Sequence, residues 1–375
     1  MKTAFIYHDD FAGYSYGQAH PLKPYRLKLT YELIDDFGLL SLPDTEMLRP
    51  VMAGEDDLLL FHEKDYLEAL KAANSGKTLP DAQSYGLGPG DNPVFEGIYD
   101  WSRLVAGASL QAAEIVACGK CDTAFSIAGG LHHALPRSAS GFCYINDPVL
   151  AIMSLLKKGS RVAYIDIDAH HGDGVQAAFY TTDRVLTISI HETGAILFPG
   201  SGFEHETGAG EGEGYSVNIP MPPTADDEVF LHAFDEIVPP LIDTFKPDFV
   251  VTQLGVDSLR GDPLAHLNYT NNGFREVVRK IKEISPRWVA LGGGGYHIAN
   301  VAKAWTLAWA VMNEAEVPDD IPAAFLRRHE SEGFQSATLR DAEYSIGGVQ
   351  KDTMRRELDR VIGVIKSKVF RKLRI

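Results

Sequence analysis

The sequence predicts an α/β fold with a single doubly wound, mainly parallel sheet flanked by helices. Two observations predict it: short apolar runs alternate with longer segments of helical period, and the composition supplies enough apolar residues for a large core. Of the 375 residues, 45% are hydrophobic and 23% are charged, which is typical of a globular protein. We find no internal repeat and no long linker in the sequence, so one sheet is expected to span it.

Six short apolar runs are predicted to be strands. In chain order they are residues 3–7, 123–128, 161–168, 185–191, 249–254 and 288–291. Six longer segments place apolar side chains at helical spacing and are predicted to be helices. They are residues 25–40, 99–117, 148–158, 226–245, 272–284 and 298–311. This alternation is the pattern of a parallel sheet that is covered on both faces.

Two long irregular segments, residues 75–93 and 192–214, are expected to be functional loops, because loops of this length are uncommon inside compact domains. Residues 192–214 contain five Glu and no Lys or Arg. An acidic loop of this kind suits a cationic partner, although an ordinary solvated loop explains the same charge.

The C-terminal segment has the opposite charge. Residues 351–375 contain nine Lys or Arg against three Asp or Glu. We predict a main domain over residues 1–320 and an extension over residues 321–375, whose basic amphipathic helix packs on that domain. A membrane surface or an acidic partner is the alternative binding surface for this helix. Its apolar residues at helical spacing are Leu358, Val361, Ile362, Ile365, Val369 and Leu373.

Charge and cysteine content exclude several classes of protein. The 35 Lys and Arg residues against 51 Asp and Glu give a net charge of −16, which argues against direct binding of nucleic acid. No apolar run approaches the roughly 20 residues of a membrane span, and Asp9 and Asp10 interrupt the N-terminal segment before a signal sequence could form. We expect a cytoplasmic protein with reduced thiols. Cys118 and Cys121 match a C-x-x-C motif but have no partner pair, so a simple helix-to-strand turn is predicted there.

The predicted strand 161–168 leads directly into a group of polar residues. Asp166, Asp168 and His170 follow at a spacing of two, which places their side chains on one side of the chain. Ligands of open α/β sheets bind beyond the carboxyl ends of the strands. We therefore predict that Asp168 and His170 are metal ligands, and that Asp257, which follows another apolar run, is the third. Three protein ligands leave a coordination position open for water or substrate, as in catalytic sites.

Two adjacent histidines, His132 and His133, follow the predicted strand 123–128 at the same edge of the sheet. A metal-dependent hydrolase needs a base for water and an acid for the leaving amine, and imidazole titrates in the required range. Each imidazole also needs an acceptor that fixes its tautomer. Asp166 and Asp173 are predicted to be these acceptors.

The predicted strand 288–291 ends in four glycines and Tyr296. A phosphate-binding loop is the alternative, but the G-x-G-x-x-G spacing and a following Lys are both missing. Glycines, Gly294 among them, allow a backbone to approach a substrate closely. Tyr296 is then expected to donate a hydrogen bond to an oxyanion that develops during the reaction.

With these motifs, the sequence resembles the histone deacetylase family, close to its bacterial class I-like and acetoin-utilisation branches. The resemblance covers nearly the whole chain. The matching segments are residues 20–21 with Arg26, 96–100, 129–133, 141–146, 166–174, 198–200, 254–257, 261–263 and 291–296. The fold implied is the arginase/deacetylase-like α/β fold, with residues 1–320 as the deacetylase domain.

The resemblance implies a lysine deacetylase that hydrolyses acetyl-lysine in an acetylated protein or peptide, releases acetate and is inhibited by hydroxamates. It makes Asp168, His170 and Asp257 the ligands of zinc, with iron as a possible replacement. It makes His133 the general base and acid, paired with Asp173. His132, paired with Asp166, becomes its electrostatic companion, and Tyr296 polarises the acetyl carbonyl.

The resemblance also implies residues around the substrate. Gly141, Phe142 and Phe198 would line a narrow acyl-lysine tunnel, with Leu264 at its mouth and Asp100 on the rim holding the substrate backbone. Two potassium sites are implied, largely through backbone carbonyls. Their residues would be Asp166, Asp168, His170 and Ser189 for the first, and Phe179, Thr182, Val185 and Tyr215 for the second.

Three alternative functions remain. An arginase-like enzyme with two manganese ions would need a further carboxylate where this chain has Gly255-Val256-Asp257. An acetylpolyamine hydrolase would favour an acidic residue where Leu264 stands. A non-catalytic acetyl-lysine reader would be expected to lack a ligand, the base or the tyrosine, and all five are present here. The sequence carries no indication of the oligomeric state.

Overall fold

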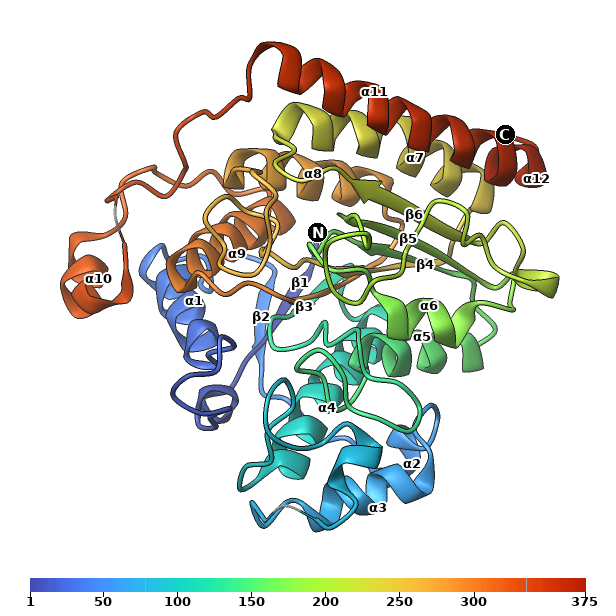
Figure 1. Ribbon diagram of the computed structural model, residues 1–375. Coiled ribbons are helices and arrows are strands. Elements are labelled where there is room, and N and C mark those ends of the chain that lie inside the picture. Colours follow the sequence, from blue (N-terminus) through green and yellow to red (C-terminus); the bar gives the residue numbers. More distant parts are fainter. Residues whose placement is uncertain (78, 335) are drawn as a thin grey trace.

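An eight-stranded sheet lies at the centre of the computed structural model, which describes residues 1–77, 79–334 and 336–375 (Figure 1). Every strand pairing in this described part is parallel, so the prediction of one mainly parallel sheet is confirmed. The strand order is β2-β1-β3-β8-β7-β4-β5-β6. The strands are β1 (Thr3–Ile6), β2 (Thr45–Leu48), β3 (Thr123–Ser126), β4 (Val162–Asp166), β5 (Val185–Glu192), β6 (Ser216–Met221), β7 (Phe249–Gln253) and β8 (Trp288–Leu291).

The sequence predicts the six inner strands but misses the two edge strands, β2 and β6. Inner strands of a parallel sheet are buried on both faces and therefore appear as continuous apolar runs. The edge strand β2 has only four residues and none of them is buried. The edge strand β6 contains Asn218 and Pro220, and a proline is tolerated at an edge because its missing N–H costs no pairing there.

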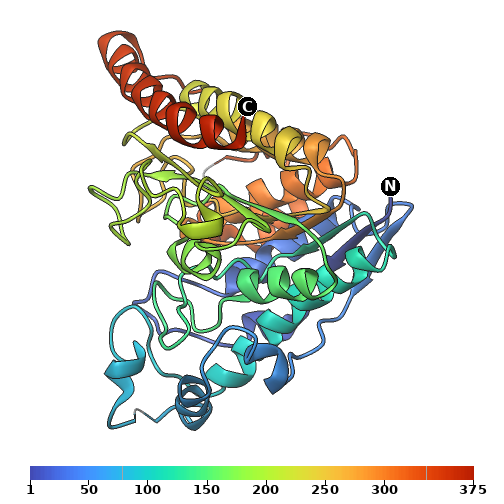
Figure 2. The ribbon, with the colours of Figure 1, turned by 90° about the vertical axis from the view of Figure 1, so that its right-hand side faces the viewer.

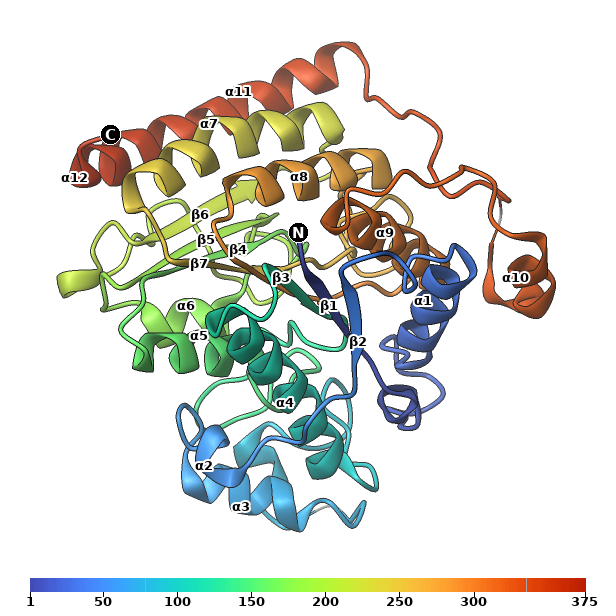
Figure 3. The ribbon, with the colours of Figure 1, turned by 180° about the vertical axis from the view of Figure 1, so that it is seen from behind.

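All six predicted helices are present, and they form a layer on each face of the sheet. Helices α7, α8, α9 and α1 lie side by side on one face, and α4, α5 and α6 lie on the other (Figures 1 and 3). The predicted helices correspond to α1 (Tyr25–Asp36), α4 (Ile98–Ala117), α5 (Asp147–Lys157), α7 (Asp227–Phe245), α8 (Asn271–Ile284) and α9 (Ile298–Met312). The further helices are α2 (Glu55–Leu58), α3 (Lys64–Ala72), α6 (Asp173–Phe179), α10 (Ala323–Arg328), α11 (Gly348–Ile365) and α12 (Arg371–Leu373), with short 3-10 turns at Asp9–Ala12, Ala82–Tyr85, Gly210–Gly212 and Glu330–Glu332.

The segments that leave the carboxyl ends of the strands are held by local polar contacts. The Asn146 side chain accepts the Val149 N–H at 3.1 Å and so caps the start of α5. Thr270 caps α8 in the same way. Strands β3 and β4 end two residues earlier than predicted, because the chain turns out of the sheet at these points. At the opposite end of the sheet, Cys118 and Cys121 lie in the turn between α4 and β3, and both are free thiols.

The C-terminal segment forms the amphipathic helix α11, which a π-helical stretch, Lys366–Phe370, joins to α12. Helix α11 runs alongside α7 and also contacts β6 (Figures 1 and 3). Its apolar face is buried, and several basic side chains pair with acidic groups of the main domain. These pairs are Arg355–Glu228, Arg360–Glu204, Lys366–Glu236 and Lys372–Glu213. A division of the chain at residue 320 stays a prediction.

Residues 75–77 and 79–93 and the long segment 192–214 lie on the same side of the molecule, away from the N-terminus at which β1 begins (Figure 2). This is the side toward which the parallel strands point. Among the helices of the described residues, none combines the length and the apolar character that crossing a membrane requires.

Candidate active site

The predicted site residues follow four strands that are neighbours in the sheet. The order β3-β8-β7-β4 places the carboxyl ends of these strands next to one another. The segment after β3 carries His132 and His133, and the segment after β8 carries Tyr296. Asp257 follows β7, and Asp168 and His170 follow β4. A parallel sheet thus gathers residues from four separate parts of the chain at one edge.

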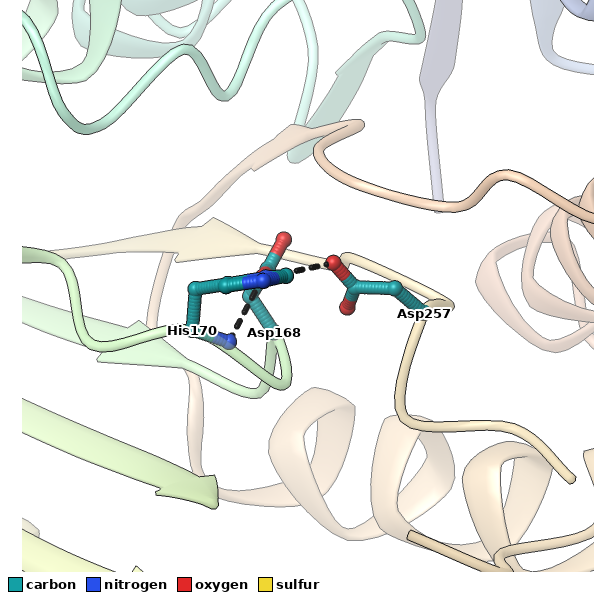
Figure 4. Close-up of side chains that lie close together, drawn as sticks. All are labelled: Asp168, His170 and Asp257. Atoms are coloured by element: carbon teal, nitrogen blue, oxygen red, sulfur yellow. Dashed lines mark hydrogen bonds and ion pairs between the residues drawn. The ribbon is translucent and has the colours of Figure 1, made fainter. Parts of the chain in front are cut away.

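Asp168, His170 and Asp257 form a compact set of donor atoms (Figure 4). One donor atom from each residue lies within 4.8 Å of the others. Nδ1 of His170 is 3.1 Å from Oδ1 of Asp168 and 2.9 Å from Oδ2 of Asp257. All three side chains are buried. Burial and the neighbouring Asp168 carboxylate raise the pKa of Asp257, so a cation bound between the two carboxylates would relieve an unfavourable arrangement.

The oxygen atoms that face away from this set are held by the surrounding backbone and by Gln253. Oδ2 of Asp168 accepts hydrogen bonds from Gln253 Nε2 at 2.6 Å and from the Gly294 N–H at 2.8 Å. Oδ1 of Asp257 accepts the Ala169 N–H at 2.8 Å. A Cβ at Gly294 would lie only 2.2 Å from Asp257 Oδ2, so glycine is required there. These contacts orient the carboxylates as supporting residues do in metal sites.

Two histidine–aspartate pairs lie beside the donor set. His132 Nδ1 donates to Asp166 Oδ2 at 2.8 Å, and His133 Nδ1 donates to Asp173 Oδ1 at 2.7 Å. The Nε2 atoms of the two rings are 3.0 Å apart, and the rings of His133 and His170 have centroids 6.0 Å apart. The structure therefore brings together the residues that the sequence suggested for acid–base chemistry.

The two histidines have opposite electrostatic environments. Burial alone would lower the pKa of His132, but the carboxylates of Asp166 and Asp168 outweigh it and raise that pKa to about 9. Burial and the positive charge of His132 lower the pKa of His133 to about 4. At neutral pH His133 is therefore the neutral imidazole, which is the form that can accept a proton.

Tyr296 keeps its phenolic proton and packs at the wall of the site. Burial, followed by the charges of Asp257 and Asp168, raises the pKa of Tyr296 well above its usual value. Its ring meets the ring of Phe142 edge-on, with centroids 5.6 Å apart. A protonated hydroxyl in this position is available as a hydrogen-bond donor.

Residues of the site line a narrow, partly open cavity of about 20 Å³. Phe142 lines this cavity, while the half-exposed ring of Phe198 packs against His133 with centroids 5.0 Å apart. The two phenylalanines thus lie against Tyr296 and His133, and a tunnel between them stays a prediction. The residues that line the cavity are Leu22, Arg26, Gly130, Leu131, His132, His133, Gly141, Phe142, Cys143, Asp168, Gly293, Gly294 and Tyr296.

The structure does not favour the rim role predicted for Asp100. Asp100 lies in the first turn of α4, where its carboxylate accepts a hydrogen bond from Asn74 Nδ2 at 2.8 Å. Asp91 is exposed and lines a surface hollow that also contains Gly141. Asp91 is therefore the carboxylate placed beside the approach to the site. Its position in the long segment 75–93 is the sequence signal that points to it. Leu264 is half-buried and follows Asp262, which accepts its N–H.

The acidic segment 192–214 carries less free charge than its sequence suggests. Glu192 is buried and pairs with His266, and Glu206 accepts the N–H groups of Gly202 and Phe203. Glu204 and Glu213 pair with basic residues of the C-terminal segment. Among the described residues only Glu211 of the five has no such partner. Four of the five glutamates are therefore bound to other groups of the chain, and the segment is expected to attract a cationic partner less strongly than its sequence suggests.

The two residue sets predicted for potassium lie near the start and the end of β5. Asp166 of β4 is the register partner of Ser189 of β5, close to the metal donor set. In the second set, Phe179 ends α6, Val185 begins β5 and the Tyr215 carbonyl already accepts the Thr187 N–H at 2.9 Å. Potassium binding at these positions stays a prediction.

An all-parallel α/β sheet with an Asp-His-Asp donor set and two histidine–aspartate pairs at its carboxyl edge is the architecture of a metal-dependent hydrolase. The chain belongs to the histone deacetylase family, because the family model described as "Histone deacetylase domain" matches residues 20–312. It is 42% identical over 324 residues to human histone deacetylase 1, and the alignment covers 86% of this chain and 66% of the human protein. The chain thus spans slightly less than two thirds of the length of that relative.

Further relatives agree with this family. Histone deacetylase B of Dictyostelium discoideum is 42% identical over 323 residues, with 86% of this chain and 76% of the relative covered. A crystal structure of an HDAC homologue from Aquifex aeolicus matches with a TM-score of 0.88 and 36% identity, over 98% of this chain and 100% of that chain. An HDAC homologue solved in complex with SAHA matches over the same shares, with a TM-score of 0.89 and 36% identity.

Proposed function

We propose that this protein hydrolyses the acetyl amide of N-ε-acetyl-lysine in proteins and releases acetate and free lysine. The observation that carries the proposal is the joint placement of the Asp168–His170–Asp257 donor set, the two histidine–aspartate pairs and Tyr296 beside aromatic walls. Zinc is the ion we propose, because three N and O donors with an open position suit a catalytic zinc site, and iron is the alternative.

The residues divide the chemistry between them. A zinc ion held by Asp168, His170 and Asp257 would polarise the acetyl carbonyl and acidify water. His133, neutral at pH 7, takes the proton of the attacking water and later gives a proton to the leaving lysine amine. The Tyr296 hydroxyl donates to the oxyanion of the tetrahedral species. Asp173 and Asp166 keep the two imidazoles in the required tautomers.

The approach to the site favours a long apolar stem with a neutral head. Phe142 and Phe198 offer two aromatic surfaces, between which the methylenes of an acetyl-lysine side chain can leave water. The charged amine of free lysine would lose its hydration without finding a partner there. We propose that Asp91, rather than Asp100, accepts hydrogen bonds from the peptide backbone at the rim.

Chelation and a hydroxamate inhibitor test the metal. We expect that removal of the metal with a chelator abolishes hydrolysis of an acetyl-lysine peptide and that added zinc restores it. SAHA, a hydroxamic acid, should inhibit the loaded enzyme and raise its Tm, because ligands that bind only the native state stabilise it. After chelation SAHA should leave the Tm unchanged. Full activity of the chelated protein would exclude the proposed mechanism.

The ratio of kcat/KM for an acetyl-lysine peptide to kcat/KM for a free acetylpolyamine shows which of the two is the better substrate. Leu264 gives no partner to the second cation of acetylspermidine, whereas Asp91 can accept N–H groups that only a peptide provides. We expect the acetyl-lysine peptide to be preferred on the order of tenfold, which corresponds to about 1.4 kcal/mol. A preference for acetylspermidine would identify the alternative, an acetylpolyamine deacetylase.

Measuring kcat/KM for different peptides at low and high salt tests whether the glutamates of the acidic segment are bound to other groups of the chain. Because most of its glutamates are bound to groups of the chain, peptides with Lys or Arg beside the acetyl-lysine should gain little. We therefore expect nearly the same peptide selectivity at both salt concentrations. A preference for basic peptides that disappears with salt would show that these glutamates are accessible to the substrate.

A further inference from the structure

Asp262 is a buried carboxylate whose hydrogen bonds are all made to backbone N–H groups. It lies on the segment between β7 and α8 and is 8% exposed. Oδ2 accepts the N–H of Tyr296 at 2.7 Å and that of His297 at 3.3 Å. Oδ1 accepts the N–H of Leu264 at 3.0 Å. In the part of the chain that the structure describes, no Lys, Arg or His lies within ion-pair distance of Asp262.

Tyr296 needs a support of this kind because it follows four glycines. Gly293 and Gly295 have φ values of 142° and 136°, in a region that side-chain-bearing residues rarely adopt. Helix α9 begins only at Ile298 and so does not fix the tyrosine itself. A segment with this conformational freedom can place a following side chain in many positions.

Other hydrogen bonds hold the backbone of the glycines but not the N–H of the tyrosine. Arg26 donates to the carbonyls of Gly295 and Gly293 at 2.8 and 2.6 Å, and Gly294 donates to Asp168. The Tyr296 N–H is instead held by Asp262. The same carboxylate binds Leu264 and therefore joins the tyrosine to the segment at the proposed tunnel mouth.

The negative charge of Asp262 makes the folded state less stable. Burial outweighs the three backbone hydrogen bonds and raises the pKa of Asp262 to about 6, above its ordinary value of 3.8. A carboxyl group whose pKa is raised on folding disfavours the folded state as the pH rises through this interval. At neutral pH the buried charge therefore lowers the stability, and the backbone hydrogen bonds offset only part of this effect.

We propose that Asp262 is a positioning residue that holds the Tyr296 backbone so that the phenolic hydroxyl reaches the oxyanion. This inference rests on the role proposed above for Tyr296. It assigns to a carboxylate outside the metal donor set a function in the chemical step. Because Asp262 acts on the chemical step through Tyr296, its loss should lower kcat only while the tyrosine hydroxyl is present.

A double-mutant cycle tests this with Asp262→Ala, Tyr296→Phe and the combination. In the wild-type background Asp262→Ala should lower kcat by about 10- to 100-fold with little change in KM, since displacements near 1 Å can cost this much. In the Tyr296→Phe background the same change should lower kcat less than about twofold. Asp262→Asn keeps one acceptor oxygen and should recover part of the lost kcat.

Asp227→Ala is the matched control, because Asp227 is a partly buried carboxylate that holds the Thr270 N–H and hydroxyl away from the donor set. Its effect on kcat should be small and equal in both backgrounds. An equal loss from Asp262→Ala in both backgrounds, with Tyr296→Phe itself impaired, would overturn the inference and leave the proposed function intact. Normal turnover of Tyr296→Phe would instead contradict the role of the tyrosine. Tm measurements on all variants show that each is folded.

Discussion

Replacing Asp257 with asparagine is expected to remove most of the bound metal and nearly all of the deacetylase activity. The Asp257 side chain is fully buried, and its Oδ2 lies 2.9 Å from His170 Nδ1. An amide is a weaker and neutral ligand, so two donors with one negative charge would remain. Loss of several kcal/mol of transition-state stabilisation by the metal corresponds to about 10³-fold or more in kcat. Elemental analysis and kcat on an acetyl-lysine peptide measure both effects.

The control for this change is Asp227→Asn, which replaces a partly buried carboxylate outside the donor set. That variant should retain the metal and a normal kcat, even if its Tm falls through weaker contacts with Thr270. An Asp257→Asn protein that keeps both its metal and its turnover would show that the donor set has been assigned to the wrong residues.

Tyr296→Phe is expected to lower kcat by about 10²- to 10³-fold and to leave KM nearly unchanged. The substitution keeps the ring that packs on Phe142 and removes only the hydroxyl. Loss of one oxyanion donor typically has an effect of this size in kcat. Because the hydroxyl acts in the transition state, substrate binding should change little.

Metal content and inhibitor binding show whether the tyrosine acts in this way. The Tyr296→Phe protein should contain as much metal as the wild type and should still be stabilised by SAHA, because Tyr296 is not part of the donor set. Loss of metal in this variant would mean that the tyrosine supports the donor set, and a wild-type kcat would mean that another group stabilises the oxyanion.

Local sequence pattern was sufficient for the inner part of the fold and for the metal donor set. The inner strands are buried on both faces, so their residues are apolar throughout. Asp168, His170 and Asp257 could be found because polar residues directly after such a run must lie at the carboxyl edge of the sheet. Strand β2 could not be predicted from the sequence, because four residues of which none is buried are equally typical of an ordinary exposed loop.

Contacts between distant parts of the chain explain what the sequence pattern missed. The free charge of the segment 192–214 depends on basic residues more than 140 positions later, such as Arg360, which pairs with Glu204. The role inferred for Asp262 depends on the N–H of Tyr296, 34 residues away. The choice between Asp91 and Asp100 depends on how segment 75–93 folds beside Gly141. None of these contacts leaves a periodic signal in the sequence.

The packing of α11 against β6 affects how molecules of this protein meet one another. An edge strand has unpaired N–H and C=O groups on its outer side, and these can template aggregation by pairing with a strand of another molecule. All six residues of β6 are nevertheless buried, and α11 is in contact with this strand. The opposite edge strand, β2, has only four residues with which a strand of another molecule could pair. Loss of the C-terminal helix would therefore expose a longer strand edge, together with the apolar face of α7, and would make the protein more prone to aggregate.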